Sequence, residues 1–168
     1  GFGNSGIEAS FKVTPSDEWI TLELVDVKGK VDSIRICNLS IALYETFGAV
    51  INACYNPDFA VSVQAIDYNV ISVPQDSAGN LLFEFFFMGL SHQFTPYPGK
   101  SRVLTATVEQ KTGLRGARLA IVTCPGRTLL KTLEKLELAF SLPHPTMDGV
   151  WGKISPEAEK SYIFCSYS

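Results

Sequence analysis

Glu45 and the two asparagines on either side of it have the residue types and the spacing of an acid–base site. Asn38 lies seven residues before Glu45, and Asn52 lies seven residues after it. A helix would place all three side chains on one face, because seven residues span about two helical turns. A carboxylate near apolar surface can act as a general base or as a nucleophile. The alternative for Glu45 is an ordinary exposed helical glutamate.

The neighbours of Glu45 have structural explanations as well as chemical ones. Asn38 could polarise a carbonyl oxygen through its amide, or it could cap the N-terminus of the helix. Asn52 could contact a substrate from the same face, or it could be a hydrogen-bonded amide of the core. Thr46 could orient a water molecule through its hydroxyl, although an ordinary helix residue is the simpler interpretation.

A second group of candidate residues lies in a glycine-rich turn between two expected strands. The turn is Gly113-Leu114-Arg115-Gly116, and Arg118 follows it. Backbone amides in such a turn, together with a guanidinium, suit the binding of phosphate. Glycine-rich turns also connect strands without binding anything, so both explanations stay open.

Other chemistries lack either their residues or their spacing. The two histidines, His92 and His144, have no partner motif, and no Gly-x-Ser-x-Gly sequence occurs. The cysteines lie far apart with no CxxC pair, which argues against zinc and against a disulfide framework. We therefore expect no metal site. We also expect four reduced, mostly buried thiols: Cys37, Cys54, Cys124 and Cys165.

Composition and charge limit the classes of protein that fit. The 168 residues suffice for one domain with a substantial core, and 46% apolar with 18% charged residues excludes a disordered chain. A net charge of −3 without a Lys/Arg block argues against nucleic acid binding. No apolar run reaches the roughly 20 residues of a membrane span. Without a recognisable signal peptide we expect a cytoplasmic protein, although a targeting segment could have been removed.

The expected elements surround one long helix. The sequence predicts this helix from Asn38 or Ser40 to the break at Asn56-Pro57. Alternating or β-rich segments predict the strands, at residues 7–13, 19–27, 60–73, 81–90, 102–111, 118–124 and 129–141. The prediction is an α+β fold in which an antiparallel sheet wraps around one long central helix. Residues 1–141 would form this domain, and the Pro-rich residues 142–168 would form a tail packed on it.

This order of elements, together with three local patterns, resembles the hotdog fold and in particular the PaaI-like acyl-CoA thioesterases. The first pattern is Glu-Thr-Phe-Gly at residues 45–48, and the others are the alternating run at residues 61–74 and the strand hairpins at residues 104–138. The resemblance covers about 100 of the 168 residues. The chain departs from the family at Ile36-Cys37-Asn38, where the family has His-Gly-Gly, and residues 76–100 look like an insertion.

The resemblance implies hydrolysis of an acyl-CoA or a similar thioester by a homodimer or tetramer, with no separate cofactor. Glu45 would be the general base or nucleophile, assisted by Asn38 and Thr46. The implied substrate-binding residues are Gly48, Asn52, Gly113, Arg115, Gly116 and Arg118. Two alternatives stay open: a dehydratase or isomerase of carrier-bound acyl chains, and a non-catalytic protein that binds small apolar ligands or lipids.

Overall fold

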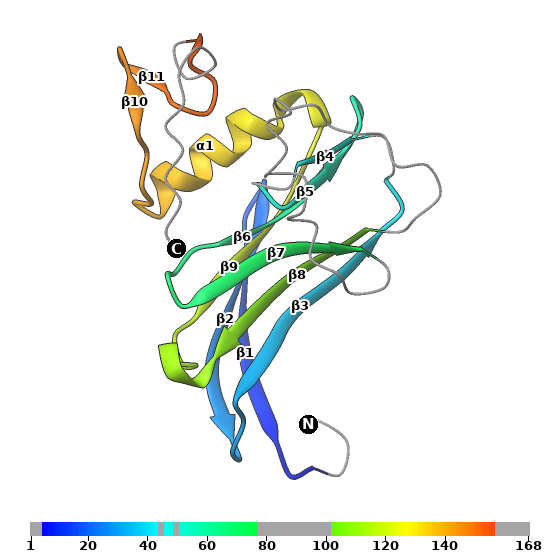
Figure 1. The fold of residues 1–168 in the computed structure, drawn as a ribbon, viewed down its shortest axis with the longest axis vertical. Coiled ribbons are helices and arrows are strands. Elements are labelled where there is room, and N and C mark those ends of the chain that lie inside the picture. The colour runs from blue at the N-terminus through cyan, green and yellow to red at the C-terminus, as the bar shows by residue number, and fades with distance from the viewer. Residues whose placement is uncertain (1–4, 44–45, 49–50, 77–101, 157–168) are drawn as a thin grey trace, which may run out of the picture. The chain divides into compact units, whose positions relative to one another are not determined.

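The computed structural model describes residues 5–43, 46–48, 51–76 and 102–156 (Figure 1). The chain forms two compact units, residues 1–127 and residues 128–168. The strands of the first unit are β1 (Glu8–Pro15), β2 (Trp19–Lys28), β3 (Ser33–Ile41), β4 (Thr46–Gly48), β5 (Ala53–Tyr55), β6 (Ala60–Ala65), β7 (Val70–Asp76), β8 (Arg102–Glu109) and β9 (Arg118–Cys124). Short 3-10 turns, η2 (Gln110–Thr112) and η3 (Gly126–Thr128), follow β8 and β9.

The strands of the first unit form two antiparallel sheets (Figure 1). The larger sheet has the order β1-β2-β9-β6-β5-β4, and the smaller sheet has the order β3-β8-β7. The chain changes sheet after β2, β3, β6 and β8, so neighbouring strands within a sheet are often distant in sequence. In the described residues β1 is therefore an edge strand whose neighbour is β2.

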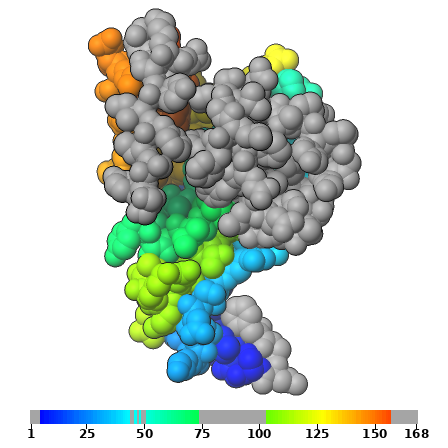
Figure 2. All heavy atoms as spheres, in the orientation of Figure 1, coloured from blue at the N-terminus to red at the C-terminus, as the bar shows by residue number. Residues whose placement is uncertain are grey.

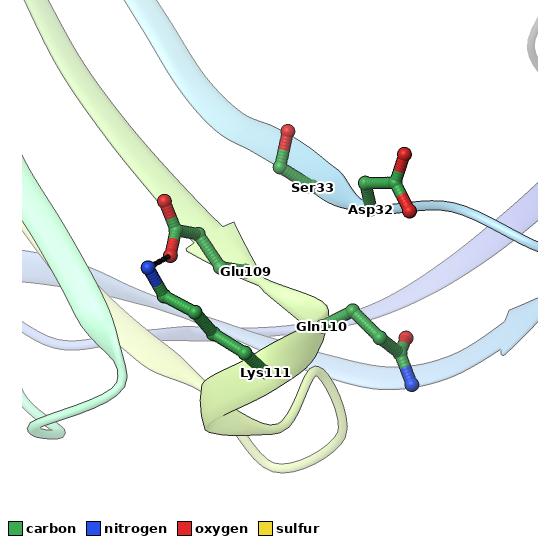
Figure 3. Close-up of a pocket in the computed structure, with 5 residues that line it drawn as sticks. All are labelled: Asp32, Ser33, Glu109, Gln110 and Lys111. Atoms are coloured by element: carbon green, nitrogen blue, oxygen red, sulfur yellow. Dashed lines mark ion pairs between the residues drawn. The ribbon is translucent and has the colours of Figure 1, made fainter.

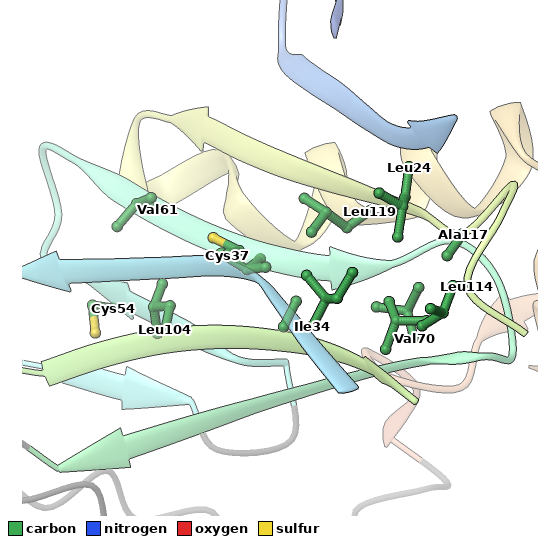
Figure 4. Packing of buried hydrophobic residues seen from close by; sticks show 13 residues of the cluster. Leu24, Ile34, Cys37, Cys54, Val61, Val70, Leu104, Leu114, Ala117 and Leu119 are labelled. Atoms are coloured by element: carbon green, nitrogen blue, oxygen red, sulfur yellow. The ribbon is translucent and has the colours of Figure 1, made fainter. Parts of the chain in front are cut away.

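Side chains from both sheets meet in one apolar core (Figure 4). Leu24 and Leu119 of the larger sheet and Leu104 and Val108 of the smaller sheet are fully buried. Burial of each such side chain stabilises the fold by about 1.5–3 kcal/mol. Alternate residues along β8 face this core, as expected for a strand with one buried face. The unit is thus a β-sandwich.

The segment predicted as a long helix is strand and turn wherever it is described. β3 runs through Asn38 and pairs with β8, and the residues after it form β4 and β5. The helix prediction was wrong because Cys37 and Leu39 face the core while Asn38 and Ser40 are exposed. This period of two belongs to a strand, and pairing with β8 satisfies its backbone.

A second correction concerns residues 129–141, which were predicted as a strand. They contain helix α1 (Leu129–Ala139). Leu129, Leu133 and Leu136 are buried, and their spacing of four and three residues is that of a helix face. The leucine-rich sequence also alternates in places, and this local alternation led to the wrong period.

The rest of the described C-terminal unit is a short hairpin. Strand β10 (Thr146–Met147) pairs with β11 (Val150–Trp151). Asp148 and Gly149 join them with φ angles of 50° and 78°, which is the conformation that Asp-Gly favours in two-residue hairpin turns. In the described residues this unit therefore contains one helix and one hairpin, between Leu129 and Trp151.

The structure combines antiparallel sheets with a helix, in agreement with the broad α+β prediction. The strands predicted at residues 7–13, 19–27 and 118–124 are confirmed by β1, β2 and β9, while residues 60–73 divide into β6 and β7. The long central helix of a hotdog fold is not found in the described residues, and the strand predicted at residues 81–90 lies outside them. Within the described ranges, no helix is long and apolar enough to cross a membrane.

Candidate functional site

The predicted acid–base residues do not share a helix face. Asn38 is exposed on β3 of the smaller sheet, whereas Thr46 and Gly48 belong to β4 of the larger sheet. Thr46 is half-buried and Gly48 is buried. Glu45 lies outside the described residues. The geometry assumed for the predicted site, one helix presenting all its side chains together, is therefore not found in the part of the chain that the structure describes.

Asn52 lies at the centre of a buried polar network between the two sheets. Its side chain is nearly inaccessible, and its φ angle of 41° falls in the left-handed region that asparagine tolerates better than most residues. The amide Nδ2 donates to Ser72 Oγ at 2.7 Å, to the Val63 carbonyl oxygen at 3.1 Å and to the Thr105 carbonyl oxygen at 3.3 Å. These are the contacts of a hydrogen-bonded core amide, one of the two explanations that the sequence left open.

Arg118, a predicted phosphate ligand, binds a carboxylate of the same chain. Its Nε and Nη2 atoms donate to Asp67 Oδ2 and Oδ1 at 2.9 and 2.7 Å, and its backbone amide donates to Oδ2 at 2.8 Å. The hydrogen bonds to Asp67 raise the pKa of the Arg118 guanidinium above its ordinary value. The edge of the guanidinium formed by Nε and Nη2 is thus paired with the Asp67 carboxylate.

Three further donors of the glycine-rich turn also have protein acceptors. Arg115 Nη2 lies 2.5 Å from Asp26 Oδ1. The Gly116 amide donates to the Leu24 carbonyl oxygen at 2.8 Å, and the Gly113 amide donates to a carbonyl oxygen of the preceding 3-10 turn at 3.2 Å. Arg115 Nη2 and the Gly113 and Gly116 amides thus have acceptors within this chain, and phosphate binding by the turn stays a prediction.

The glycine-rich turn and the β6–β7 turn close the same end of the sandwich (yellow-green and green in Figure 2). Asn69 Nδ2 donates to the Gly113 carbonyl oxygen at 2.8 Å, which joins the two turns. Leu114 points into the core from between the glycines (Figure 4). The φ angles of Gly113 and Gly116, 94° and 78°, explain why glycine stands at both positions. In this structure the glycine-rich sequence forms a turn that places Leu114 in the core.

An open depression of about 500 Å³ lies beside this end of the sandwich (Figure 3). Its lining comes from the residue before β3 and the start of β3, and from the end of β8 and the 3-10 turn η2: Asp32, Ser33, Glu109, Gln110 and Lys111. Lys111 Nζ lies 2.6 Å from Glu109 Oε2, and the backbone amide of Gln110 donates to the backbone carbonyl oxygen of Asp32 at 2.8 Å.

The C-terminal unit contains a cluster of charged and aromatic side chains that the sequence analysis missed. His144 Nδ1 lies 3.0 Å from Glu137 Oε2, and Lys153 Nζ lies 2.5 Å from Glu137 Oε1. The His144 ring stacks on Trp151 with a centroid distance of 5.6 Å and an interplanar angle of 13°. Lys153 Nζ also lies 5.0 Å from the centre of the Trp151 ring. No local motif marks this cluster, because its members come from α1, the loop after it and the hairpin.

The first unit also has an exposed apolar surface on β1. Phe11 and Val13 pair with Leu24 and Leu22 of β2, so all four side chains lie on the core-facing side of the larger sheet. Leu24 is completely buried, yet Phe11 and Val13 are 40% and 59% exposed. Ile20, opposite Pro15 on the same side, is also 43% exposed. We call Phe11, Val13 and Ile20 the β1 wing.

The β1 wing was not predicted, although the alternation of residues 7–13 could have indicated it. The sequence revealed that one face of this strand is apolar, but it could not show that β1 would be the outermost strand. Among the described residues, the larger sheet therefore presents apolar side chains at an open edge.

No protein-family model matches the chain, and no curated protein or solved structure is significantly similar to it.

Proposed function

We propose that this chain is a protein-interaction module whose binding surface is the β1 wing. The observation that carries the proposal is the exposure of Phe11 and Val13 on the core-facing side of an edge strand. Apolar side chains in an amphipathic strand are normally covered, and a contiguous exposed group of them is typical of an interaction surface.

Both the side chains and the backbone of the β1 wing favour a polypeptide partner. Covering an exposed phenylalanine and an exposed valine would contribute a few kcal/mol, since about 25 cal/mol is gained for each Å² of apolar surface removed from water. The outer edge of β1 offers N–H and C=O groups that an added strand can pair with. The assembly into dimers or tetramers expected from the sequence would form most simply at this surface.

Acyl-thioester hydrolysis stays a prediction from the sequence. Its central carboxylate, Glu45, lies outside the described residues, and the phosphate donors proposed for coenzyme A, Arg115 and Arg118, bind aspartates. An assay for thiol release from a panel of acyl-CoA substrates, with Glu45→Gln as the matched variant, tests it directly. Turnover that Glu45→Gln abolishes would establish the enzyme and refute a purely interacting role.

A photo-cross-linking experiment tests the interaction module. Benzoylphenylalanine is placed at position 13 in the wing, or at position 59 as a control, because Phe59 is 45% exposed in the turn between β5 and β6. We expect position 13 to give a discrete adduct with a polypeptide, in the purified protein or in its native cells, and position 59 to give none. An absence of adducts from position 13, or equal adducts from both positions, would refute the proposal.

A further inference from the structure

We infer that the partner of the β1 wing is a second copy of this chain, paired antiparallel through β1. The inference rests on the proposed function and adds the identity and alignment of the partner. Residues 7–13 read Ile-Glu-Ala-Ser-Phe-Lys-Val, and their residue types are symmetric about Ser10. In two copies related by a two-fold axis at Ser10, apolar residues would therefore lie opposite apolar residues on one face. On the other face, opposite charges would lie across from each other.

Charge complementarity fixes the alignment. With the axis at Ser10, Glu8 of each copy lies opposite Lys12 of the other, which gives two cross-strand ion pairs. Within one chain Glu8 lies opposite Lys28, with Lys28 Nζ 2.9 Å from Glu8 Oε2, and Lys12 lies opposite Glu23. The polar face of the paired sheets would then carry a row of alternating charges over four strands: Lys28, Glu8, Lys12 of the second copy and Glu23 of the second copy.

The apolar face agrees with the same alignment. Phe11 lies opposite Ala9 of the second copy, so the large ring of one strand covers a small side chain of the other. Val13 lies opposite Ile7, which is half-buried. Four exposed side chains, Phe11 and Val13 of each copy, are covered together. An alignment shifted by one residue would put charged side chains against apolar ones, because successive residues of a strand point to opposite faces.

Six of the seven residues of the symmetric segment, Glu8 to Val13, belong to β1. Pro15 ends β1 and has no amide hydrogen, so it cannot extend a ladder of backbone hydrogen bonds. The pairing is confined to about seven residues on each strand. An interface of this size is small, and we expect a reversible, concentration-dependent dimer. An extended segment of a different protein could also add to β1. The second copy is favoured because its own β1 carries the charges that are complementary to Glu8 and Lys12.

Charge exchange between two variants gives the sharpest test. Lys12→Glu leaves two glutamates opposite each other in a homodimer, and Glu8→Lys leaves two lysines opposite each other. We expect each variant alone to associate about tenfold more weakly than the native chain, since two attractive pairs become repulsive. An equimolar mixture should recover association. In the mixed dimer the two glutamates of the Lys12→Glu chain lie opposite the two lysines of the Glu8→Lys chain, so both cross-strand pairs are attractive again. Lys30→Glu is the matched control, since Lys30 is exposed in the turn after β2, and it should leave association unchanged.

Sedimentation velocity over a concentration series measures the association. The native chain should approach twice its mass of 18.4 kDa as its concentration rises. Oxidative cross-linking fixes the alignment: Ser10→Cys should give a dimer whose disulfide joins position 10 of one copy to position 10 of the other, as identified by peptide mass spectrometry. Thr14→Cys should give no such dimer. Circular dichroism of every variant verifies that the sandwich is intact.

The possible results distinguish pairing with a second copy from binding of a different polypeptide at the β1 wing. A chain that stays monomeric, gives no Ser10→Cys dimer and shows no recovery in the mixture overturns this inference. If position 13 still cross-links to a different polypeptide, the interaction module stands and only its partner changes. If position 13 gives no adduct at all, both proposals fall.

Discussion

Gly126 packs so closely against Asn56 that no side chain fits between them. A Cβ atom on Gly126 would overlap the Asn56 carbonyl oxygen and would lie 2.8 Å from the carbonyl carbon of the same residue. Asn56 is itself held in its turn, because its Oδ1 accepts hydrogen bonds from the amides of Asp58 and Phe59 at 3.0 and 2.8 Å. The turn after β9 and the turn after β5 are therefore in direct backbone contact.

Gly126→Ala should destabilise the first unit by about 3 kcal/mol, because the backbone of one turn must move to accept the methyl group. Urea unfolding followed by circular dichroism measures the loss. Gly113→Ala is the matched control: a Cβ there meets open space, so only its φ angle of 94° is unfavourable, and the expected loss is about 1 kcal/mol. Equal losses in the two variants would contradict the steric explanation.

Asp67→Asn should lower the free energy of unfolding by about 1–2 kcal/mol. The carboxylate accepts three hydrogen bonds from Arg118, and the gain is moderate because the guanidinium is 40% exposed. Lys111→Ala, which removes a more exposed ion pair with Glu109, should cost less than about 0.5 kcal/mol. Chemical denaturation of both variants checks the order, and a larger loss for Lys111→Ala would contradict it.

Cys37 should make stability fall in alkaline solution. Burial raises the pKa of the Cys37 thiol above its ordinary value. A group whose pKa is raised by folding stabilises the folded state below its unfolded pKa, and this contribution disappears as the pH rises through the folded pKa. The native chain should therefore lose stability relative to Cys37→Ala as the pH rises above the ordinary thiol pKa of about 8.5. Parallel denaturation series of the two proteins measure the difference, and a gap that does not change with pH would disprove the linkage.

A thiol-modification experiment gives a second readout of the same burial. Cys37 and Cys54 are buried, whereas Cys124 is partly exposed. In the folded protein Cys124 should react with a thiol reagent before Cys37, since the thiolate is the reactive form and access is required. Mass spectrometry of the modified peptides gives the order.

His144→Ala should expose Trp151 to solvent and weaken the C-terminal unit by about 1 kcal/mol, because it removes both the stacked ring and a hydrogen bond to Glu137. Acrylamide quenching of Trp151 fluorescence, in a Trp19→Phe background, measures the exposure. His144→Phe keeps a stacking ring but not the hydrogen bond, so its quenching should lie between that of the native chain and that of His144→Ala. Equal quenching in all three proteins would show that the stack does not protect Trp151.

The sequence predicted those strands whose side chains alternate cleanly. β1 and β2 each have one apolar face, so their period of two is visible without knowledge of their neighbours. β9 is apolar on both faces, and its short run of β-branched and aliphatic residues between turns predicted the strand. Residues 129–139 were misjudged because their leucines satisfy both a helical and an alternating pattern over short windows. Asn38 was misjudged for the opposite reason: it can begin a helix, but its place on β3 is decided by hydrogen bonds to β8, whose residues lie far along the chain.

The site residues were harder to predict than the elements, because their partners are remote in sequence. Arg118 and Asp67 are 51 residues apart, so nothing local to the glycine-rich turn showed that its arginine was already occupied. The cluster of Glu137, His144 and Trp151 likewise depends on how a helix, a loop and a hairpin fold back on one another. Local patterns indicated where polar residues would concentrate, but only the fold determines which of them meet.

The hydrogen bonds of Asn52 have a consequence for folding. Its amide needs acceptors on β6, β7 and β8, which lie 11, 20 and 53 residues away in the sequence. Apolar contacts would tolerate a sliding of one sheet over the other, whereas a buried amide that misses its acceptors costs about 1–3 kcal/mol. The three acceptors of Asn52 Nδ2 come together only when both sheets are in their native alignment. A shifted alignment would leave this buried donor without them, so Asn52 favours the native alignment over its near neighbours.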